Sequence, residues 1–368
     1  MTDNPYESLP ASAFWRTAVA DLPAQDIRGL WQPKFDISEQ SCIITAGSCF
    51  AQHIGRALRE RGYGWYDAEP APGSVELQKA YQYGLFSFRT GNIYTTRMLN
   101  QWVRWAHAPD KCPDMFWQTE GGIFDPFRPT VEMDGFLSIE EARASRRSTL
   151  AAIMDAVRKA DVLIFTLGLT ECWREKETGI EYAMCPGTVA GTFDPEIHEF
   201  HNMNYSEVVR ELNRAIASLR KTNPNLHILL TVSPVPLTAS ATGQHVLNAT
   251  SYSKSVLRAA AGAIAESSDF IDYFPSYEII TNPVFEGRFY AANKRSIRPE
   301  GVDHVMRCFF HDLAVGNGRP VEAPVPAMAG AMAGAQTDDD DLAPEDDDAQ
   351  CDEEMLAAFQ PEQNAKGA

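Results

Sequence analysis

A small nucleophile stands where a predicted strand gives way to a predicted helix. The apolar run that begins at Cys42 stops at Gly47 and Ser48, and the residues after it repeat at helical spacing. In an open α/β sheet, functional groups gather at the carboxyl ends of strands, beside the unpaired N–H groups of the following helix. A hydroxyl at Ser48 can attack a carbonyl carbon, provided that a base removes its proton and donors hold the oxyanion. The simpler interpretation of the Gly-Ser turn is a helix N-cap.

The neighbouring thiol offers a second route. Cys49 follows Ser48 directly, and a cysteine at a helix N-terminus can have a lowered pKa and serve as the nucleophile itself. The alternative is that Cys49 is a small buried apolar residue.

The string Gly-Ser-Cys-Phe-Ala, Gly47 to Ala51, resembles the motif that names the GSCFA family, a group related to the SGNH (GDSL-like) hydrolases. The resemblance extends over about residues 36–313. It implies a serine hydrolase-like fold and ester or acyl-transfer chemistry. Ser48 would then be the nucleophile, and the N–H of Ser48 or Cys49 would help to hold the oxyanion.

Two further segments resemble conserved blocks of the SGNH hydrolases. In the second block a glycine supplies a backbone N–H to the oxyanion, and Gly91 of the turn Gly91-Asn92 resembles it. The segment that starts at Gly168 resembles the third block, Gly-x-Asn-Asp, with Thr170 and Glu171 in place of Asn and Asp. A threonine hydroxyl can donate one hydrogen bond to an oxyanion, with a shorter reach than an asparagine amide.

The general base does not stand at its expected place. SGNH hydrolases carry Asp-x-x-His just ahead of the last helix, whereas alignment on Pro299-Glu300-Gly301 puts Asn293 and Ser296 at those two positions. We consider three histidines instead. His201 and His304 rank equally, the first in a predicted insertion and the second inside the last helix, and His53 ranks behind them.

Glu171 is a fourth candidate for the base. If burial raised its pKa, this carboxylate at the end of a strand could take the serine proton or orient a histidine. The alternative interpretation is an acid in the first turn of a helix.

Apolar runs of strand length alternate with amphipathic helical patterns. Strands are predicted at 161–167, 225–232 and 270–274, and helices at 139–159, 205–221, 251–266 and 299–313. This alternation predicts an α/β fold with three α/β/α layers and a doubly wound, mostly parallel sheet, as in SGNH hydrolases. Residues 172–204 are predicted to form an irregular insertion that partly covers the site.

The chain divides into three regions by composition. Residues 1–40 are predicted to be an irregular arm whose aromatic residues, among them Trp15 and Trp31, are buried by packing. Residues 41–316 form the α/β domain. Residues 317–368 are predicted to be a disordered acidic tail, since residues 320–368 carry a charge of −12 out of the chain's −18. Met355, Leu356 and Phe359 in that tail are either a weak docking element or part of a purely solubilising segment.

Several classes of function are disfavoured. The remaining charge of −6 argues against a nucleic-acid partner. The seven scattered cysteines predict free thiols in a reducing compartment, without a metal site, and no phosphate-binding glycine motif follows a strand, so we expect no cofactor. No apolar run is long enough to span a membrane, and we expect a cytoplasmic protein.

These observations lead to a hydrolase hypothesis with two rivals. We expect an SGNH-like serine esterase that acts on an acyl ester, namely an O-acylated carbohydrate or polysaccharide precursor, a substrate class taken from analogy. The first rival is an acyltransferase on a cell-surface polysaccharide. The second is a non-catalytic sugar- or acyl-binding protein that has lost the Asp-x-x-His pair.

Overall fold

The computed structural model describes residues 4–73, 80–321 and 351–360. Its backbone contacts divide the chain into two units. The first unit comprises Met1–Asp36 and Phe274–Asp348, and the second comprises Ile37–Tyr273 and Ala349–Ala368. The boundary after Tyr273 lies within residues 41–316, over which a single α/β domain is predicted.

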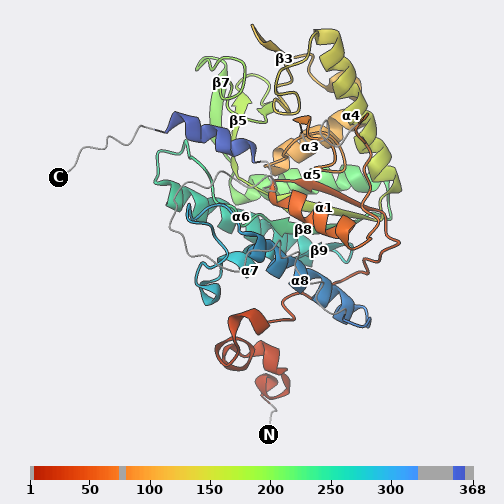
Figure 1. Cartoon of the computed structure of the whole chain (residues 1–368), viewed down its shortest axis with the longest axis vertical. Helices are drawn as coiled ribbons and strands as arrows, with labels where there is room; N and C mark the ends of the chain where they lie inside the picture. Colours follow the sequence, from red (N-terminus) through yellow and green to blue (C-terminus); the bar gives the residue numbers. More distant parts are fainter. Residues whose placement is uncertain (1–3, 74–79, 322–350, 361–368) are drawn as a thin grey trace, which may run out of the picture. The chain divides into compact units, whose positions relative to one another are not determined.

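A parallel sheet of four strands forms the centre of the second unit (Figure 1). In spatial order the strands are β1 (Ile43–Gly47), β4 (Val162–Leu167), β8 (His227–Val232) and β9 (Ile271–Tyr273). Within each pair the register brings apolar residues level, for example Phe165 opposite both Ala46 and Leu230. All residues of β1 and β4 are buried, as expected of strands covered on both faces.

Helices cover both faces of this sheet. On the face of Thr45, α1 (Phe50–Glu60) approaches so closely that a β-carbon on Gly55 would lie 3.2 Å from Thr45 Oγ1. On the face of Ile44 and Ala46, side chains of three helices meet the sheet. These are α3 (Thr96–His107), α4 (Ile139–Lys159) and α5 (Tyr205–Thr222), and α6 (Val246–Glu266) packs against α5, β8 and β9. The predicted three-layer α/β/α fold with a parallel sheet is confirmed.

Side-chain caps explain where three of these helices begin. The Thr95 hydroxyl accepts a hydrogen bond from the Met98 N–H at the start of α3, and Ser138 caps α4 in the same way. Asn204 and Glu207 form a reciprocal capping box at the start of α5. Each cap satisfies backbone N–H groups that the first turn of a helix leaves without a partner.

The segment predicted to be an irregular insertion is an ordered antiparallel sheet. Its strands, in the spatial order β6-β5-β7, are β6 (Glu181–Tyr182), β5 (Glu171–Glu175) and β7 (His198–Asn202). The prediction of irregular structure was wrong here because these strands are short and polar, and their pairing joins residues far apart in sequence, for example Trp173 and Phe200. Ahead of them lies a hairpin of β2 (Trp117–Thr119) and β3 (Gly122–Phe124).

The first unit has its own aromatic cluster. Trp31 stacks on Phe309 and meets Phe274 edge-on, while the Asp312 carboxylate accepts hydrogen bonds from the N–H groups of Gly29 and Trp31. The prediction that the arm's aromatic residues are buried holds for Trp31 but is wrong for Trp15, which is 65% exposed. The unit also contains α7 (Ser276–Thr281), α8 (Pro299–Gly316) and the short helices η1 (Pro5–Ser8), η2 (Ala11–Ala13), η3 (Arg16–Ala20), η4 (Ala24–Asp26) and η6 (Pro283–Phe285).

Ten residues of the predicted disordered tail have a defined place in the second unit. Residues 351–360 contain the helical segment η7 (Asp352–Phe359), in which Asp352 and Glu353 are buried. The structure therefore differs from the prediction over this stretch, because the buried residues Asp352 and Glu353 and the half-buried Leu356 attach it to the α/β unit. Residues 322–350 and 361–368 lie outside the described residues.

Candidate active site

The turn between β1 and α1 requires glycine at its first position. Gly47 has φ +131°, and a β-carbon there would lie 2.3 Å from the Thr166 carbonyl oxygen of the neighbouring strand β4. The close approach lets the N–H of Ser48 donate to that same oxygen at 3.0 Å, while Gly47 O accepts the N–H of Ile93. The turn therefore holds Ser48 at the carboxyl ends of two central strands.

Ser48 carries a buried hydroxyl at this turn. The residue is 2% exposed, and its Oγ has no hydrogen-bond partner within the described parts of the chain. A buried hydroxyl without a partner is costly in a purely structural role. The predicted N-cap role is also absent, since the N-cap position of α1 is Cys49 and no side chain caps that helix.

Asn92, next to Gly91, holds a carboxyl group. Gly91 adopts φ +66°, and the Asn92 Nδ2 donates to Oδ2 of Asp352 at 2.8 Å. The backbone N–H of Asn92 and the side chains of Gln82 and Thr130 also hydrogen-bond the Asp352 carboxyl. Burial raises the pKa of Asp352, and these four hydrogen bonds only partly oppose that effect. The predicted oxyanion and substrate-binding segment thus binds oxygen atoms in the structure.

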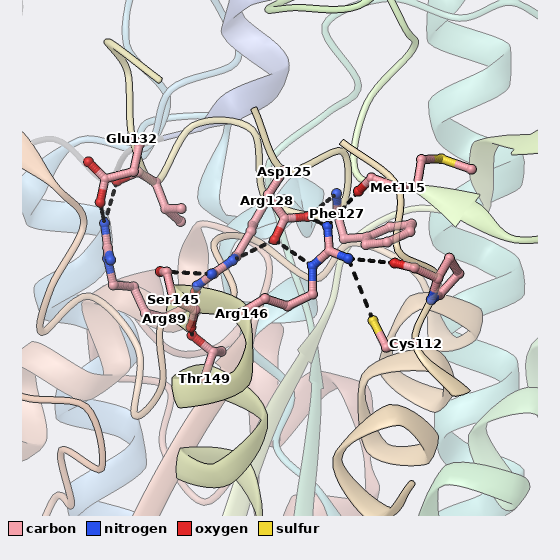
Figure 2. A network of polar contacts seen from close by, with 12 residues as sticks. Arg89, Cys112, Met115, Asp125, Phe127, Arg128, Glu132, Ser145, Arg146 and Thr149 are labelled. Carbon is pink, nitrogen blue, oxygen red and sulfur yellow. Dashed lines mark hydrogen bonds and ion pairs between the residues drawn. The ribbon is translucent and has the colours of Figure 1, made fainter. Parts of the chain in front are cut away.

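A buried ion network braces the segment that carries Asn92 (Figure 2). Asp125 is fully buried between two arginines, with Arg128 Nε at 3.0 Å and Arg146 Nη2 at 2.8 Å from its oxygens. Arg128 Nη1 also donates to the backbone oxygen of Arg89 at 2.9 Å, three residues before Asn92. Although burial favours the neutral acid, the charges of Arg146 and Arg128 hold the pKa of Asp125 below its usual range.

The turn after β4 is fixed by α6. Lys254 Nζ donates to the Gly168 carbonyl at 2.7 Å, and the N–H of Thr170 donates to Ser253 Oγ. The Thr170 hydroxyl donates to Asn202 Oδ1 at 2.7 Å. That hydroxyl is therefore already engaged, and a role in holding an oxyanion would require it to turn away from Asn202.

None of the predicted bases bonds the Ser48 hydroxyl within the described residues. His201 lies on β7, where its Nε2 is 3.0 Å from Glu207 Oε1, and burial together with the charge of Arg174 lowers its pKa. His304 belongs to the first unit, where it stacks on Phe289, and burial and Arg28 lower its pKa to about 4.

Glu171 and Cys49 are placed differently from the histidines. Glu171 begins β5 rather than a helix, so the interpretation as a first-turn helix acid was wrong. Its oxygens accept the Ser240 hydroxyl at 2.8 Å and the Ala241 N–H, and burial nevertheless raises its pKa. Cys49 is buried, with its Sγ 3.1 Å from Cys351 Sγ.

A largely apolar pocket of about 430 Å³ adjoins Asn92 and Glu171. Its walls include Asn92, Tyr94 and Glu171, the aromatic residues Trp173, Tyr182 and Phe200 of the three-stranded sheet, and Phe193 from the connection between β6 and β7. Tyr94 connects the pocket to the turn after β4, because its carbonyl accepts the N–H groups of Gly168 and Leu169. The pocket is large enough for a small ligand with one apolar portion.

Two acids in this region were not expected from the sequence. Glu181 lies in the pocket wall, where burial raises its pKa to about 7 against the hydrogen bond from Thr95 and the charge of Arg97. Nothing in the sequence around Glu181 distinguishes it from a surface acid. Asp352 belongs to the acidic tail, where only the apolar residues Met355, Leu356 and Phe359 gave a signal.

The described residues contain neither a metal-binding cluster nor a membrane-spanning helix. Across residues 4–73, 80–321 and 351–360, no group of three His, Cys, Asp or Glu side chains is arranged to hold a metal ion. The helices in these same ranges include none with the length and apolar character needed to cross a bilayer.

Comparison with known proteins gives one match. Residues 42–309 match the sequence profile of the GSCFA family, over most of the chain. No curated protein and no solved structure matches the chain.

Proposed function

From the premise that this chain belongs to the GSCFA family, we propose that it is a serine-dependent hydrolase of acyl esters with Ser48 as its nucleophile. The observation that carries the proposal is the Ser48 hydroxyl, which is buried at the carboxyl ends of β1 and β4 and has no hydrogen-bond partner among the described residues. A nucleophile that is held in place without being engaged is ready to meet a substrate.

The donors beside Ser48 support carbonyl chemistry. The N–H and side-chain amide of Asn92 already bind the oxygens of a carboxyl group, and such donors can equally bind the carbonyl oxygen of an ester. In this mechanism Ser48 Oγ attacks the carbonyl carbon, Asn92 and the N–H of Cys49 stabilise the oxyanion, and the ester's alcohol leaves with the proton taken from Ser48. Water then hydrolyses the acyl-enzyme.

Glu171 is the base that we assign to the serine proton. It lines the same pocket as Asn92, and burial raises its pKa, which is the direction that makes a carboxylate a better proton acceptor. His201 and His304 are the alternatives, but the first is paired with Glu207 and the second lies among aromatic rings of the first unit.

We further propose that the ester is an O-acylated carbohydrate or polysaccharide precursor in the cytoplasm. The aromatic walls of the pocket support this choice, because rings such as Trp173 and Phe200 offer faces for an acyl chain or a sugar ring. Transfer of the acyl group to a polysaccharide hydroxyl would use the same acyl-enzyme, with the sugar replacing water.

A serine-directed fluorophosphonate tests the nucleophile. We expect wild-type protein and Cys49→Ala to be labelled, and Ser48→Ala not to be labelled. Labelling that persists in Ser48→Ala but is lost in Cys49→Ala would assign the reaction to the thiol. A folded wild-type protein that is not labelled would instead favour the non-catalytic binding protein.

A further inference from the structure

The carboxyl group of Asp352 is buried in a cluster of neutral donors. Asp352 is 7% exposed, and the groups that hydrogen-bond it are amides and a hydroxyl from Gln82, Asn92 and Thr130. Burying a carboxyl group without a cationic partner is unfavourable, and an apolar residue would fill such a place at lower cost. The cluster is therefore suited to oxygen atoms rather than to packing.

The three donors and their acceptor come from different parts of the protein. Gln82, Asn92 and Thr130 lie within residues 42–309, which match the GSCFA family, whereas Asp352 lies outside that match. The donor cluster thus lies in the part of the chain that matches the family, and the carboxyl group that fills it lies C-terminal to that part.

Other residues of this C-terminal segment, residues 351–360, contact the candidate site as well. Cys351 Sγ lies 3.1 Å from the thiol of Cys49, the residue after Ser48, and the N–H of Glu353 donates to the Tyr94 hydroxyl at 3.3 Å. Leu356 and Phe359 line the apolar pocket. A polar head at Asp352 followed by two apolar side chains is the pattern of an acyl group, with oxygens at one end and hydrocarbon beyond.

We propose that Gln82, Asn92 and Thr130 form a subsite for the carbonyl or carboxyl oxygens of an acyl ligand, and that Asp352 fills this subsite in cis as a tethered occupant. Only the identity of the ligand as an acyl group rests on the proposed function. Residues 322–350 can span about 100 Å when extended, so docking within one chain is sterically allowed. A substrate must then displace the segment 351–360 before it can reach Asn92.

Disulfide trapping in the full-length protein tests the docking. Diamide takes two electrons and two protons from a pair of thiols, which become a disulfide while the diazene becomes a hydrazine. We expect rapid formation of a Cys49–Cys351 disulfide within monomers, identified by peptide mass spectrometry and non-reducing electrophoresis. Asp352→Ala should slow this reaction about tenfold, since it leaves the buried donors of the subsite unpaired.

A matched control separates docking from simple loss of charge. Glu354 lies two residues further along the same segment and is exposed, so Glu354→Gln should trap at the wild-type rate. Trapping of Asp352→Ala at the wild-type rate, absence of the Cys49–Cys351 disulfide, or a disulfide that joins two chains would each overturn the proposal.

Fluorophosphonate labelling of the same proteins tests whether the segment covers the site. Reduced Asp352→Ala should be labelled at Ser48 faster than wild type, and the disulfide-locked wild type more slowly than its reduced form. Equal labelling of all three would show that the segment does not obstruct the site and would overturn its role as an occupant. If no form is labelled, the proposed hydrolase fails, while the trapping rates still decide whether Asp352 docks.

Discussion

Gly168 lies against Ser48 so closely that a β-carbon on the glycine would stand 2.9 Å from Ser48 Cβ. The same β-carbon would meet Tyr94 Cδ1 and the Tyr94 carbonyl oxygen at 3.1 Å. The glycine therefore makes the space in which the nucleophile turn and the Tyr94 segment come together. Its carbonyl is held by Lys254, so the turn cannot easily move away.

Gly168→Ala is expected to displace Ser48 and to destabilise the fold. Overpacking of this kind costs about 1–3 kcal/mol, which chemical denaturation will measure. We expect fluorophosphonate labelling of Ser48 to fall as well. Gly121→Ala is the control, because a β-carbon there meets only the Thr119 hydroxyl at 3.6 Å. Equal stability of the two variants would show that the turn after β4 can relax.

Glu171→Gln is expected to slow the labelling of Ser48 by about 100-fold or more, since the variant removes the proposed proton acceptor but keeps the size of the side chain. His201→Gln should leave the rate close to that of wild type, because His201 Nε2 is engaged with Glu207. Circular dichroism will verify that both variants fold. The reverse order of the two rates would assign the base to His201.

Asp125→Asn is expected to lower the free energy of unfolding by about 3–5 kcal/mol, because it leaves two buried arginines without their shared counter-charge. Asp114→Asn breaks an exposed ion pair with Arg143, which lies on α4 as Arg146 does. This variant should lose far less stability. Urea denaturation compares the two variants. Similar losses would mean that the buried network contributes little to stability.

The same network predicts how the stability of the fold changes with pH. Because the pKa of Asp125 is lower in the folded protein than its usual value, the stabilisation is present above that usual value and is lost as pH falls through the folded pKa. Wild type should therefore lose stability on acidification more steeply than Asp125→Asn. Parallel profiles of the two proteins in the acid range would contradict the assignment.

The buried Glu181 should make stability change with pH in the opposite direction. Its folded pKa of about 7 exceeds its ordinary value of 4.5, so between these values the unfolded chain binds fewer protons and stability falls as pH rises. The slope cannot exceed about 1.4 kcal/mol per pH unit. The charged or titratable groups that face the carboxyl are Arg97, Cys172 and Glu211.

Glu181→Gln should flatten this part of the profile and make the protein more stable than wild type at pH 8, as followed by thermal unfolding from pH 4.5 to 8. The exposed Glu177→Gln is the control and should follow wild type. A Glu181→Gln profile that declines as steeply as that of wild type would show that another group titrates.

The central sheet was predictable because burial on both faces leaves a continuous apolar run. Val162–Leu167 was predicted as 161–167, and His227–Val232 as 225–232. The three-stranded sheet was not predictable in this way, since β5 and β7 mix charged and aromatic residues and acquire their structure from pairing with each other.

The candidate site was only partly predictable, for the same reason. Local motifs located Ser48, Gly91 and Gly168, and backbone hydrogen bonds join the turns after β1 and β4 to Ile93 and Tyr94, which follow Gly91 closely in the chain. Asp352, the partner of Asn92, lies 260 residues away along the chain. Its segment is so acidic that the sequence predicts exposure to solvent. Burial raises the pKa of Asp352 and of Glu181. The burial of a single acid cannot be predicted from the local sequence.

The order β1-β4-β8-β9 follows the order of the chain, so each strand joins the edge formed by the strand made before it. A sheet of this kind can grow during synthesis from its N-terminal strand, without waiting for distant partners. Asp352 is translated after every strand of that sheet. On our proposal, a nascent chain would thus present an open acyl site until Asp352 has been made and has docked.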